Sequence, residues 1–325
     1  MTERDKSDGV VLADVGGTNV RFAVLKDGAL GPIAHLTVAE YERFTDALAA
    51  FMIHQPGRSA ICNAIFGVAG VVEDGRCVLT NNLWVVDAQE LRTRFGFTEV
   101  YVVNDFEALA WSLPHFTSND VRKLGGLEVK SNAPMLVLGP GTGLGAAVYV
   151  PREQGGFALH TEAGHSTMPS GSKREDAIIE MLRHRFGHVS VERILSGHGL
   201  ENLYHTIAAL DSLRVPERSA AEITKAGLAG HCAASRNAIE TFCAMLGEVA
   251  GNLALGIGAQ GGVFITGGIT THLREYLPRS QFRARFEAKG RMSRYVAAIP
   301  VYLILHEDPA FIGLQSLAKQ RSWIA

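Results

Sequence analysis

The chain has 325 residues, a length that favours two domains over a single core. Hydrophobic residues make up 47% and charged residues 20%, which is the composition of a globular protein with apolar material for packed cores. The net charge of -2 gives no electrostatic attraction to nucleic acid or to an anionic membrane. We therefore expect neither a nucleic acid nor a membrane as a partner.

Three features bear on the cellular location. The first eight residues, MTERDKSD, are too polar for the apolar core of a signal peptide. The uncharged stretch from Val249 to Ile269 has the length of a membrane span, but its glycines and polar residues favour a buried helix followed by a buried strand. The four cysteines show neither a CxxC pair nor zinc-ligand spacing: Cys62, Cys77, Cys232 and Cys243. Free thiols in a reducing cytoplasm are the simplest interpretation, so we expect a cytoplasmic protein.

Two hairpins with glycine turns stand out along the chain. Residues 10–25 read as an apolar strand, the turn DVGGTN and a second apolar strand. Residues 134–150 repeat this plan around GPGTGLG. Because GTNVRFAV at 17–24 aligns with GTGLGAAV at 141–148, we expect two domains that each begin with such a hairpin.

The rest of the chain alternates between strand-like and helix-like segments. Strands are predicted at residues 60–72, 100–103, 262–266 and 300–306. Helices are predicted at residues 45–53, 106–113, 175–186, 219–229, 235–259 and 309–319. Pro114 is expected to end the second of these helices. The alternation predicts an α/β protein.

The DVGGTN turn is the first candidate for binding phosphate. Its glycines can present backbone N–H groups to anionic oxygens, and Thr18 adds a hydroxyl donor. Asp14 precedes the turn and could hold Mg²⁺, directly or through water. The alternative is a plain hairpin turn without a ligand.

Two later glycine segments could complete a nucleotide site. GPGTGLG is not a P-loop, since no Gly-Lys-Ser/Thr follows, and not a Rossmann fingerprint, since a strand-like segment comes next. The pair in FITGGI follows a buried strand and could lie flat against a nucleoside, although a turn without a ligand is the alternative. The nucleotide-site candidates are Asp14, Gly16, Gly17, Thr18, Asn19, Gly141, Thr142, Gly143, Gly267 and Gly268.

VVNDFEAL places Asn104 and Asp105 after a strand and at a helix start. Asn104 with Glu107 three residues later resembles a capping box, which would explain the segment without catalysis. An acid at the carboxyl end of a strand is also where general bases are found. Both interpretations stay open from the residues alone.

Three further side chains could hold a sugar. LHTEAGH supplies Glu162 and His165, and SVERILSG supplies Glu192. Carboxylates and a neutral imidazole accept hydrogen bonds from sugar hydroxyls. For each residue alone, a solvated or structural role is the alternative. His160, His184, His188 and His198 show no metal-ligand spacing and receive no role.

Taken in order, these motifs resemble those of the bacterial glucokinase family of the hexokinase/actin superfamily. The resemblance runs from about Val11 to the C-terminus. It is carried by DVGGTN, VVNDFEAL, GPGTGLG, TEAGH, VERILSGHGLENLY, GGVFITGGI and PVYLILHEDPAFIG. It implies a two-domain α/β fold of the actin/hexokinase-like (ribonuclease H-like) type, with glucose in the cleft between the domains. We expect a small domain of residues 1–114 plus 307–325 and a large domain of residues 115–306.

The resemblance also implies an activity, the ATP-dependent phosphorylation of the 6-hydroxyl of glucose. Asp105 falls on the family's catalytic base, and four residues fall on positions that hold the sugar: Asn104, Glu162, His165 and Glu192. The glycine segments fall on the phosphate and adenosine regions. ATP and Mg²⁺ are the expected cofactors, and a homodimer is the expected assembly. Closure of the domains around glucose would exclude water from the site.

Three departures from the family pattern are visible. Pro140 stands where a small residue is more common and removes one possible phosphate donor. His160-Thr161 replaces a common Pro-Gly, and Ala163 replaces Gly. The cysteine-rich zinc motif of the related repressor/kinase group is missing, which favours the zinc-free branch. The alternatives are another hexose or amino-hexose kinase, a non-catalytic sugar sensor and an actin-like filament protein.

Overall fold

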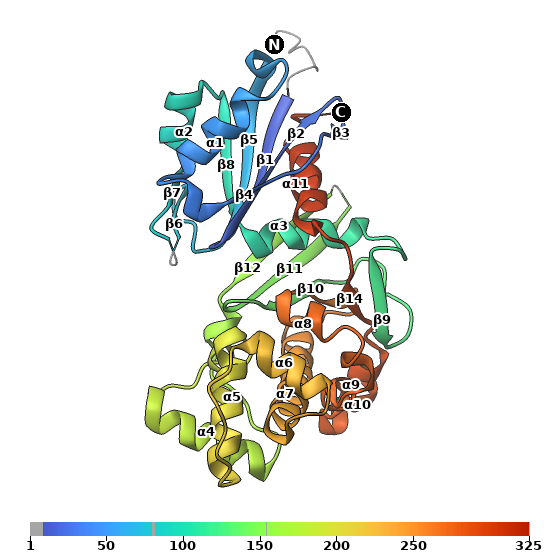
Figure 1. Cartoon of the computed structure of the whole chain (residues 1–325). Coiled ribbons are helices and arrows are strands. Elements are labelled where there is room, and N and C mark those ends of the chain that lie inside the picture. Colours follow the sequence, from blue (N-terminus) through green and yellow to red (C-terminus); the bar gives the residue numbers. More distant parts are fainter. Residues whose placement is uncertain (1–8, 80–81, 154, 325) are drawn as a thin grey trace. The chain divides into compact units, whose positions relative to one another are not determined.

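The computed structural model describes residues 9–79, 82–153 and 155–324, which pack into two compact units (Figure 1). The first unit comprises Met1–Phe116, Glu153–His160 and Glu307–Ala325. The second comprises Thr117–Arg152 and Thr161–His306. Residues 153–160 thus group with the first unit, although they lie inside the predicted large domain. The domain boundaries at residues 114 and 307 stay a prediction.

One sheet forms the centre of the first unit. Its strands are β1 (Gly9–Val15), β2 (Asn19–Lys26), β3 (Ala29–Leu30), β4 (Ala34–Thr37), β5 (Ile61–Val68) and β8 (Glu99–Asn104). Their order is β3-β2-β1-β5-β8, with β4 also paired to β2. β1 and β2 form an antiparallel hairpin, and β5 and β8 continue the sheet in parallel. A separate antiparallel pair consists of β6 (Arg76–Val78) and β7 (Val85–Asp87).

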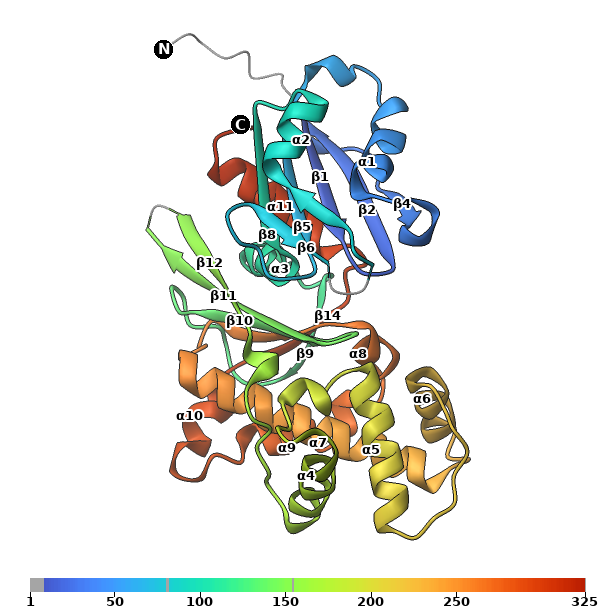
Figure 2. The same ribbon diagram turned by 90° about the vertical axis from the view of Figure 1, so that its left-hand side faces the viewer.

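Helices cover both faces of this sheet (Figure 2). They are α1 (Phe44–Ile53), α2 (Ala88–Phe95), α3 (Asp105–Ser112) and α11 (Pro309–Gln320). On the α1 face, the ring of Phe44 packs against Phe22 at 5.9 Å and Phe66 at 5.2 Å between centroids. On the other face α11 packs against α3, and Gly313 touches the carbonyl of Ala108 so closely that a Cβ would overlap it. The C-terminal helix therefore belongs to the core of the first unit.

The second unit repeats the sheet plan of the first. The second sheet consists of β9 (Val121–Gly125), β10 (Met135–Pro140), β11 (Leu144–Arg152), β12 (Gly155–Thr161), β13 (Gly262–Ile265) and β14 (Val301–Ile304), in the order β12-β11-β10-β13-β14-β9. All of these strands belong to the second unit except β12, which groups with the first unit up to His160. β10 and β11 form an antiparallel hairpin, and β13 and β14 continue from it in parallel. The prediction of two glycine-turned hairpins, one in each domain, is confirmed, although β9 precedes the hairpin in the second unit.

A long helix organises the rest of the second unit. The helices are α4 (Lys173–Phe186), α5 (Gly197–Leu210), α6 (Ala220–Leu228), α7 (Ala233–Ile257), α8 (Gly268–His272), α9 (Phe282–Glu287) and α10 (Ser293–Ala298). α7 contacts α5, α6 and α9. Gly247 in α7 allows the backbone of Phe282 to approach, since a Cβ would overlap its carbonyl. Close packing of this kind fixes α9 against α7.

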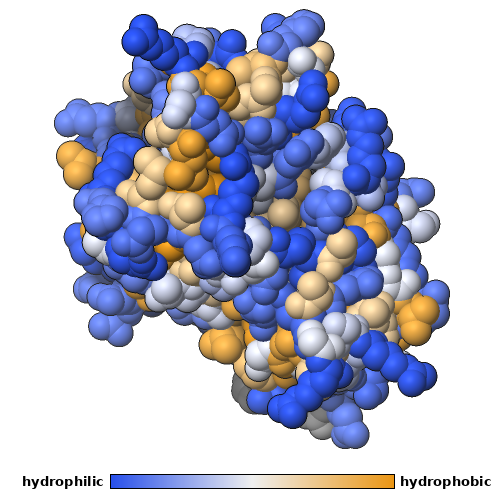
Figure 3. Space-filling view, turned by 90° about the horizontal axis from the view of Figure 1, so that it is seen from below, coloured by the Kyte–Doolittle hydropathy of each residue, from blue (hydrophilic) through white to orange (hydrophobic). Residues whose placement is uncertain are grey.

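The apolar length of α7 serves this core. Within the described residues α7 is long and apolar enough to cross a membrane, but 67% of its apolar window is buried inside the protein. It ends at Gly258, which has a φ of +69°, and β13 follows. The predicted buried helix followed by a buried strand is therefore confirmed. On the face drawn in Figure 3, hydrophobic side chains form separate groups among hydrophilic ones.

The remaining predicted elements agree with the structure within a few residues, and several other elements were not predicted. α3 ends at Ser112, and Pro114 lies in the 3-10 helix that follows it, η3 (Leu113–His115). The unpredicted elements include β9, which is a polar strand, and α5, which begins with Gly-His-Gly. Glycine is a poor helix former, so burial of one face of α5 outweighs its local propensity. Among the described residues no disulfide links any of the four cysteines.

Candidate active site

Asn104 and Asp105 lie where β8 ends and α3 begins. Asn104 is the N-cap of α3, and its Oδ1 accepts hydrogen bonds from the N–H groups of Phe106 at 2.9 Å and Glu107 at 3.3 Å. Its Nδ2 donates to the carbonyl of Gly70 at 3.0 Å. The cap predicted from the sequence is confirmed. It holds Asp105 as the first residue of the helix, where the dipole favours a negative charge and where ligands of open sheets bind.

Glu162 and His165 lie on a short turn that follows β12. Residues Ala163–His165 form the 3-10 helix η4, and Nε2 of His165 lies 3.8 Å from Oε2 of Glu162. Both side chains are more than half exposed. Gly164 packs so closely on the carbonyl of Leu144 that a Cβ would overlap it. The turn therefore presents a carboxylate and an imidazole side by side, as a ligand with several hydroxyl groups requires.

Two residues that depart from the family pattern hold this turn in place. The hydroxyl of Thr161 donates to the carbonyl of Ala146 at 3.1 Å and accepts a hydrogen bond from the N–H of Ala163 at 3.3 Å. The methyl group of Ala163 packs against the core of the second unit. These substitutions thus keep Glu162 on an ordered turn.

Glu192 reaches the second glycine turn. It lies in the 3-10 helix η5 (Val191–Arg193), and its Oε2 accepts a hydrogen bond from the N–H of Leu144 at 3.0 Å. Gly143 lies against the same carboxylate, which a Cβ would overlap. The N–H of Val191 donates to the carbonyl of Ser166 at 2.9 Å. The structure therefore places the Glu192 segment beside the residues that follow His165 and beside GPGTGLG.

The third glycine segment packs against the second. The N–H of Thr266 donates to the carbonyl of Leu138 at 3.0 Å. Gly267 has a φ of +103°, which favours glycine, and a Cβ there would also overlap the carbonyl of Pro140. Gly268 begins α8, with nothing within 4 Å of the place a Cβ would take. Two of the three predicted nucleotide segments are thus neighbours in the second unit.

The N-terminus of α5 meets the same turn, a feature absent from the predictions. The N–H of Gly197 donates to the carbonyl of Gly141 at 2.9 Å. Ser196 caps the helix by accepting a hydrogen bond from the N–H of Gly199 at 3.0 Å. A helix N-terminus attracts phosphate. Ser196 is a residue type that favours an N-cap, which could have indicated the start of α5. Gly197 and Gly199 disfavour a helix, and α5 was therefore not predicted.

The DVGGTN turn closes the β1–β2 hairpin in the first unit. The N–H of Gly16 donates to the carbonyl of Asn19 at 3.0 Å. The carbonyl of Gly17 accepts a hydrogen bond from Nδ2 of Asn82 at 3.1 Å. Asn82 is a second feature that the sequence did not reveal, because it lies far along the chain from the turn that it holds.

Asp14 is part of a charged cluster beside this turn. Its Oδ2 accepts a hydrogen bond from Nη1 of Arg21 at 2.8 Å, and Nε of Arg21 lies 3.2 Å from Oδ1 of Asp308. Burial raises the pKa of Asp14, and the opposing effect of the Arg21 guanidinium does not cancel this rise. A carboxylate perturbed in this way is typical of functional sites.

Asp14 is the acidic residue for which a Mg²⁺ site is predicted. Within the described residues no cluster of three or more His, Cys, Asp or Glu side chains is placed to hold a metal ion. Mg²⁺ commonly binds through one or two carboxylates together with water and substrate phosphates. The carboxylate of Asp14 fits that limited role.

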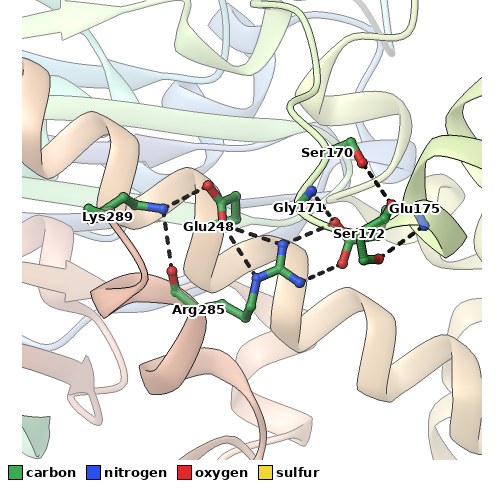
Figure 4. A network of polar contacts seen from close by, with 7 residues as sticks. All are labelled: Ser170, Gly171, Ser172, Glu175, Glu248, Arg285 and Lys289. Carbon is green, nitrogen blue, oxygen red and sulfur yellow. Dashed lines mark hydrogen bonds and ion pairs between the residues drawn. The ribbon is translucent and has the colours of Figure 1, made fainter. Parts of the chain in front are cut away.

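A buried ion-pair network fixes the chain beyond His165 (Figure 4). The guanidinium of Arg285 lies 2.6 Å from Glu175 and 3.3 Å from Glu248, and Lys289 lies 2.7 Å from Glu248. Burial raises the pKa of Glu175, but the Arg285 guanidinium and the N–H of Gly171 outweigh it, so this pKa lies below its ordinary value. The network ties the start of α4 to α7 and α9.

The fold and its glycine turns define a class of protein. A hairpin continued by two parallel strands, present in both units, with an acid at the end of β8, is the arrangement of a sugar kinase with the actin-like ATPase fold. A solved glucokinase from an Antarctic psychrotroph shares the fold, with a TM-score of 0.86 and 32% identity over 97% of this chain and 99% of that one. A ROK family glucokinase from Streptomyces griseus, solved with glucose and AMPPNP, shares the fold at 18% identity, with a TM-score of 0.62 over 96% and 99% of the two chains.

Sequence comparison is more specific. The family profile described as Glucokinase matches residues 11–321. The chain is 45% identical over 311 residues to a glucokinase of Paramagnetospirillum magneticum, covering 95% of this chain and 97% of the relative. It is 41% identical over 307 residues to a glucokinase of Nitrobacter hamburgensis, with coverage of 94% and 96%. The chain belongs to the glucokinase family.

This membership confirms the family, the fold class and the kinase class predicted from the sequence. The individual site residues fall into two groups. Asn104 and Asp105 lie in the first unit, and Glu162, His165 and Glu192 lie together in the second. Their roles toward a substrate stay predictions.

Proposed function

We propose that this protein transfers the γ-phosphate of ATP to the 6-hydroxyl of glucose, giving glucose 6-phosphate and ADP. Membership of the glucokinase family along nearly the whole chain carries this proposal. The local geometry supports it, because each predicted sugar-binding side chain stands on an ordered segment next to a strand end or a glycine turn.

Asp105 is proposed as the general base. Phosphoryl transfer needs positioning and charge stabilisation more than covalent chemistry, so one carboxylate that accepts the proton of the attacking hydroxyl is sufficient. The rigid cap made by Asn104 supports this role, since it fixes the first turn of α3. Holding the hydroxyl and phosphate in line can lower the barrier by about 7–11 kcal/mol.

The proposed sugar ligands are Asn104, Glu162, His165 and Glu192. Two carboxylates, an amide and an imidazole can satisfy the donors and acceptors of several ring hydroxyls at once. A site built from such groups rejects a sugar that leaves one of them unpaired, which gives selectivity for one hexose over another.

ATP is proposed to bind the glycine segments. Gly16, Gly17, Thr18 and Asn19 would contact the phosphates from the first unit, and Gly141, Thr142 and Gly143 would do so from the second. Gly267 and Gly268 would lie against the nucleoside. The N-terminus of α5 beside Gly141 supports phosphate binding there. Asp14 would hold Mg²⁺, which when bound neutralises charge on the phosphates.

We also propose that the enzyme works in the cytoplasm as a homodimer. The homodimer rests on the family resemblance, and the cytoplasmic location rests on the interpretation of the four cysteines as free thiols. Light scattering of the purified protein would test the assembly, since a particle of one chain's mass, 35.0 kDa, contradicts the dimer.

The activity is tested by following ADP formation from Mg-ATP with glucose, mannose, fructose, N-acetylglucosamine, N-acetylmannosamine or no sugar. We expect rapid turnover with glucose and little with the other sugars or water. Turnover on an amino sugar instead would overturn the substrate but keep the kinase. No turnover from folded protein with ATP, ADP or polyphosphate as donor would favour a non-catalytic sugar sensor or a filament protein.

A further inference from the structure

His160, to which the motifs gave no role, contacts the helix that carries Asp105. It lies near the end of β12, and its Nδ1 is 3.6 Å from Oε2 of Glu107 on α3. The side chain of Glu107 is 17% exposed and that of His160 is 40% exposed. Both residues belong to the first unit. A carboxylate enclosed to this extent needs a nearby cation or donor.

The surroundings of Glu107 make His160 its main partner. Burial raises the pKa of Glu107, and His160 acts in the opposite direction. Burial raises the pKa of Tyr101 on β8, and the negative charge of Glu107 adds to this rise. The guanidinium of Arg321 lies over the ring of Tyr101, 4.1 Å from its centroid. Arg321 is thus engaged with an aromatic face, whereas the imidazole of His160 faces the carboxylate directly.

Glu107 is rigidly connected to the proposed catalytic residue. Its N–H and that of Phe106 both donate to Oδ1 of Asn104, and the residue between Asn104 and Phe106 is Asp105. The Asn104 cap thus fixes the backbone at Glu107, so the side chain of Glu107 offers His160 a firm point of attachment. The cap at Asn104 accounts for the backbone N–H of Glu107. The side chain of Glu107 has a different partner, which is His160.

His160 is also connected to a proposed sugar ligand. Glu162 follows His160 by two residues, so the Cα atoms of the two residues are at most about 7 Å apart. Between them Thr161 is fixed by its hydrogen bond to Ala146, and Ala163 donates back to Thr161. The two residues before Glu162 are therefore both held by side-chain contacts, His160 by Glu107 and Thr161 by the carbonyl of Ala146.

We propose that His160 is a positioning residue for glucose, which fixes the start of the Glu162 segment on α3 through Glu107. This rests on the proposed function, because Glu162 must bind the sugar for its placement to matter. His160 itself need not touch glucose. Loss of the contact removes the first of the two side-chain contacts that hold the residues before Glu162, so glucose binds less tightly while nucleotide binding is unchanged.

The test uses His160→Ala, Glu107→Ala and the double variant in the full-length protein. Each single variant is expected to raise the KM for glucose about three- to fivefold, in line with the strength of a partly exposed polar contact, with kcat and the KM for ATP within about twofold of wild type. The double variant should be no worse than either single variant, because both remove the same contact. His160→Gln, which keeps a donor, should recover part of the affinity.

His184→Ala is the matched control. His184 lies 3.5 Å from Glu180 in another His–Glu pair, on the exposed side of α4, and its loss should leave all three constants unchanged. Three outcomes would overturn the proposal. They are additive effects of the two substitutions, an unchanged KM for glucose, or a fall in kcat together with similar rises in the KM values for glucose and ATP. If wild-type protein shows no glucose-dependent turnover, the proposed function fails instead, and the two failures are distinguishable.

Discussion

The carboxylate of Glu192 accepts a hydrogen bond from the backbone N–H of Leu144 at 3.0 Å. This hydrogen bond links Glu192, which is predicted to bind the sugar, to the end of the GPGTGLG turn, which is predicted to bind phosphate. Gly143 leaves room for this contact, since any side chain there would meet the same carboxylate. Glu192 is therefore placed to influence both substrates.

Glu192→Ala should weaken the binding of both substrates. We expect the KM for glucose to rise about tenfold or more, as for loss of a charged hydrogen bond, and the KM for ATP to rise by a smaller factor because the turn loses its anchor. Glu162→Ala is the comparison, since the carboxylate of Glu162 faces His165 and not the GPGTGLG turn. This variant should raise the KM for glucose and leave the KM for ATP unchanged. Steady-state kinetics with each substrate varied would show this, and an ATP constant unchanged by Glu192→Ala would contradict it.

Asp105→Asn should separate binding from chemistry. The amide keeps the size of the carboxylate but cannot accept a proton, so kcat should fall by about 10²–10⁴ while the affinity for glucose is retained. Calorimetric titration with glucose beside steady-state turnover measures the two quantities. If glucose binding disappears together with turnover, Asp105 has a structural role and not a base role.

Gly267→Ala and Gly268→Ala should behave differently although the positions are adjacent. At Gly267 the φ of +103° and the Pro140 carbonyl both oppose a side chain, so the free energy of unfolding should fall by about 1–3 kcal/mol or more. Apart from its chain neighbours and the backbone of its own helix, a methyl group at Gly268 meets no protein atom within 4 Å. This variant should keep its stability and, if the nucleoside lies there, raise the KM for ATP. Equal destabilisation of both variants in urea denaturation would refute this distinction.

Glu175→Gln should flatten the acid side of the stability profile. The pKa of Glu175 lies below its ordinary value of 4.5 in the folded protein, so the unfolded chain binds more protons as the pH falls below that value. Its contribution is present above about pH 4.5 and is lost as the pH falls through the folded pKa. The variant should be less stable at neutral pH by about 1–3 kcal/mol, with a smaller further loss in acid.

Glu180→Gln is the control for this experiment. Glu180 lies on the same helix but is 55% exposed, so its substitution should shift neither the stability at neutral pH nor the slope in acid. Urea denaturation at neutral pH and near pH 4 measures both quantities. An acid slope for Glu175→Gln equal to that of wild type would mean that the ion-pair network of Figure 4 does not perturb Glu175.

Local patterns predicted much of the fold. The two glycine-turned hairpins, the long buried helix followed by a strand, and the cap at Asn104 all depend on residues within a few positions of one another. Such features are governed by backbone geometry, capping and hydrophobic periodicity, which can be read along the chain. Helix α5 escaped because its start is rich in glycine and its stability comes from burial.

The ordered motifs alone also determined the family, and with it the kinase class, because their residues are identifiable without knowing where they lie in space. Only the tertiary structure decided which side chains meet across the chain: Asp308 on Arg21, Glu192 on the N–H of Leu144, and His160 on Glu107. These partners are distant in sequence. Their contacts are set by strand order and helix packing, which bring together segments that no local propensity or spacing relates.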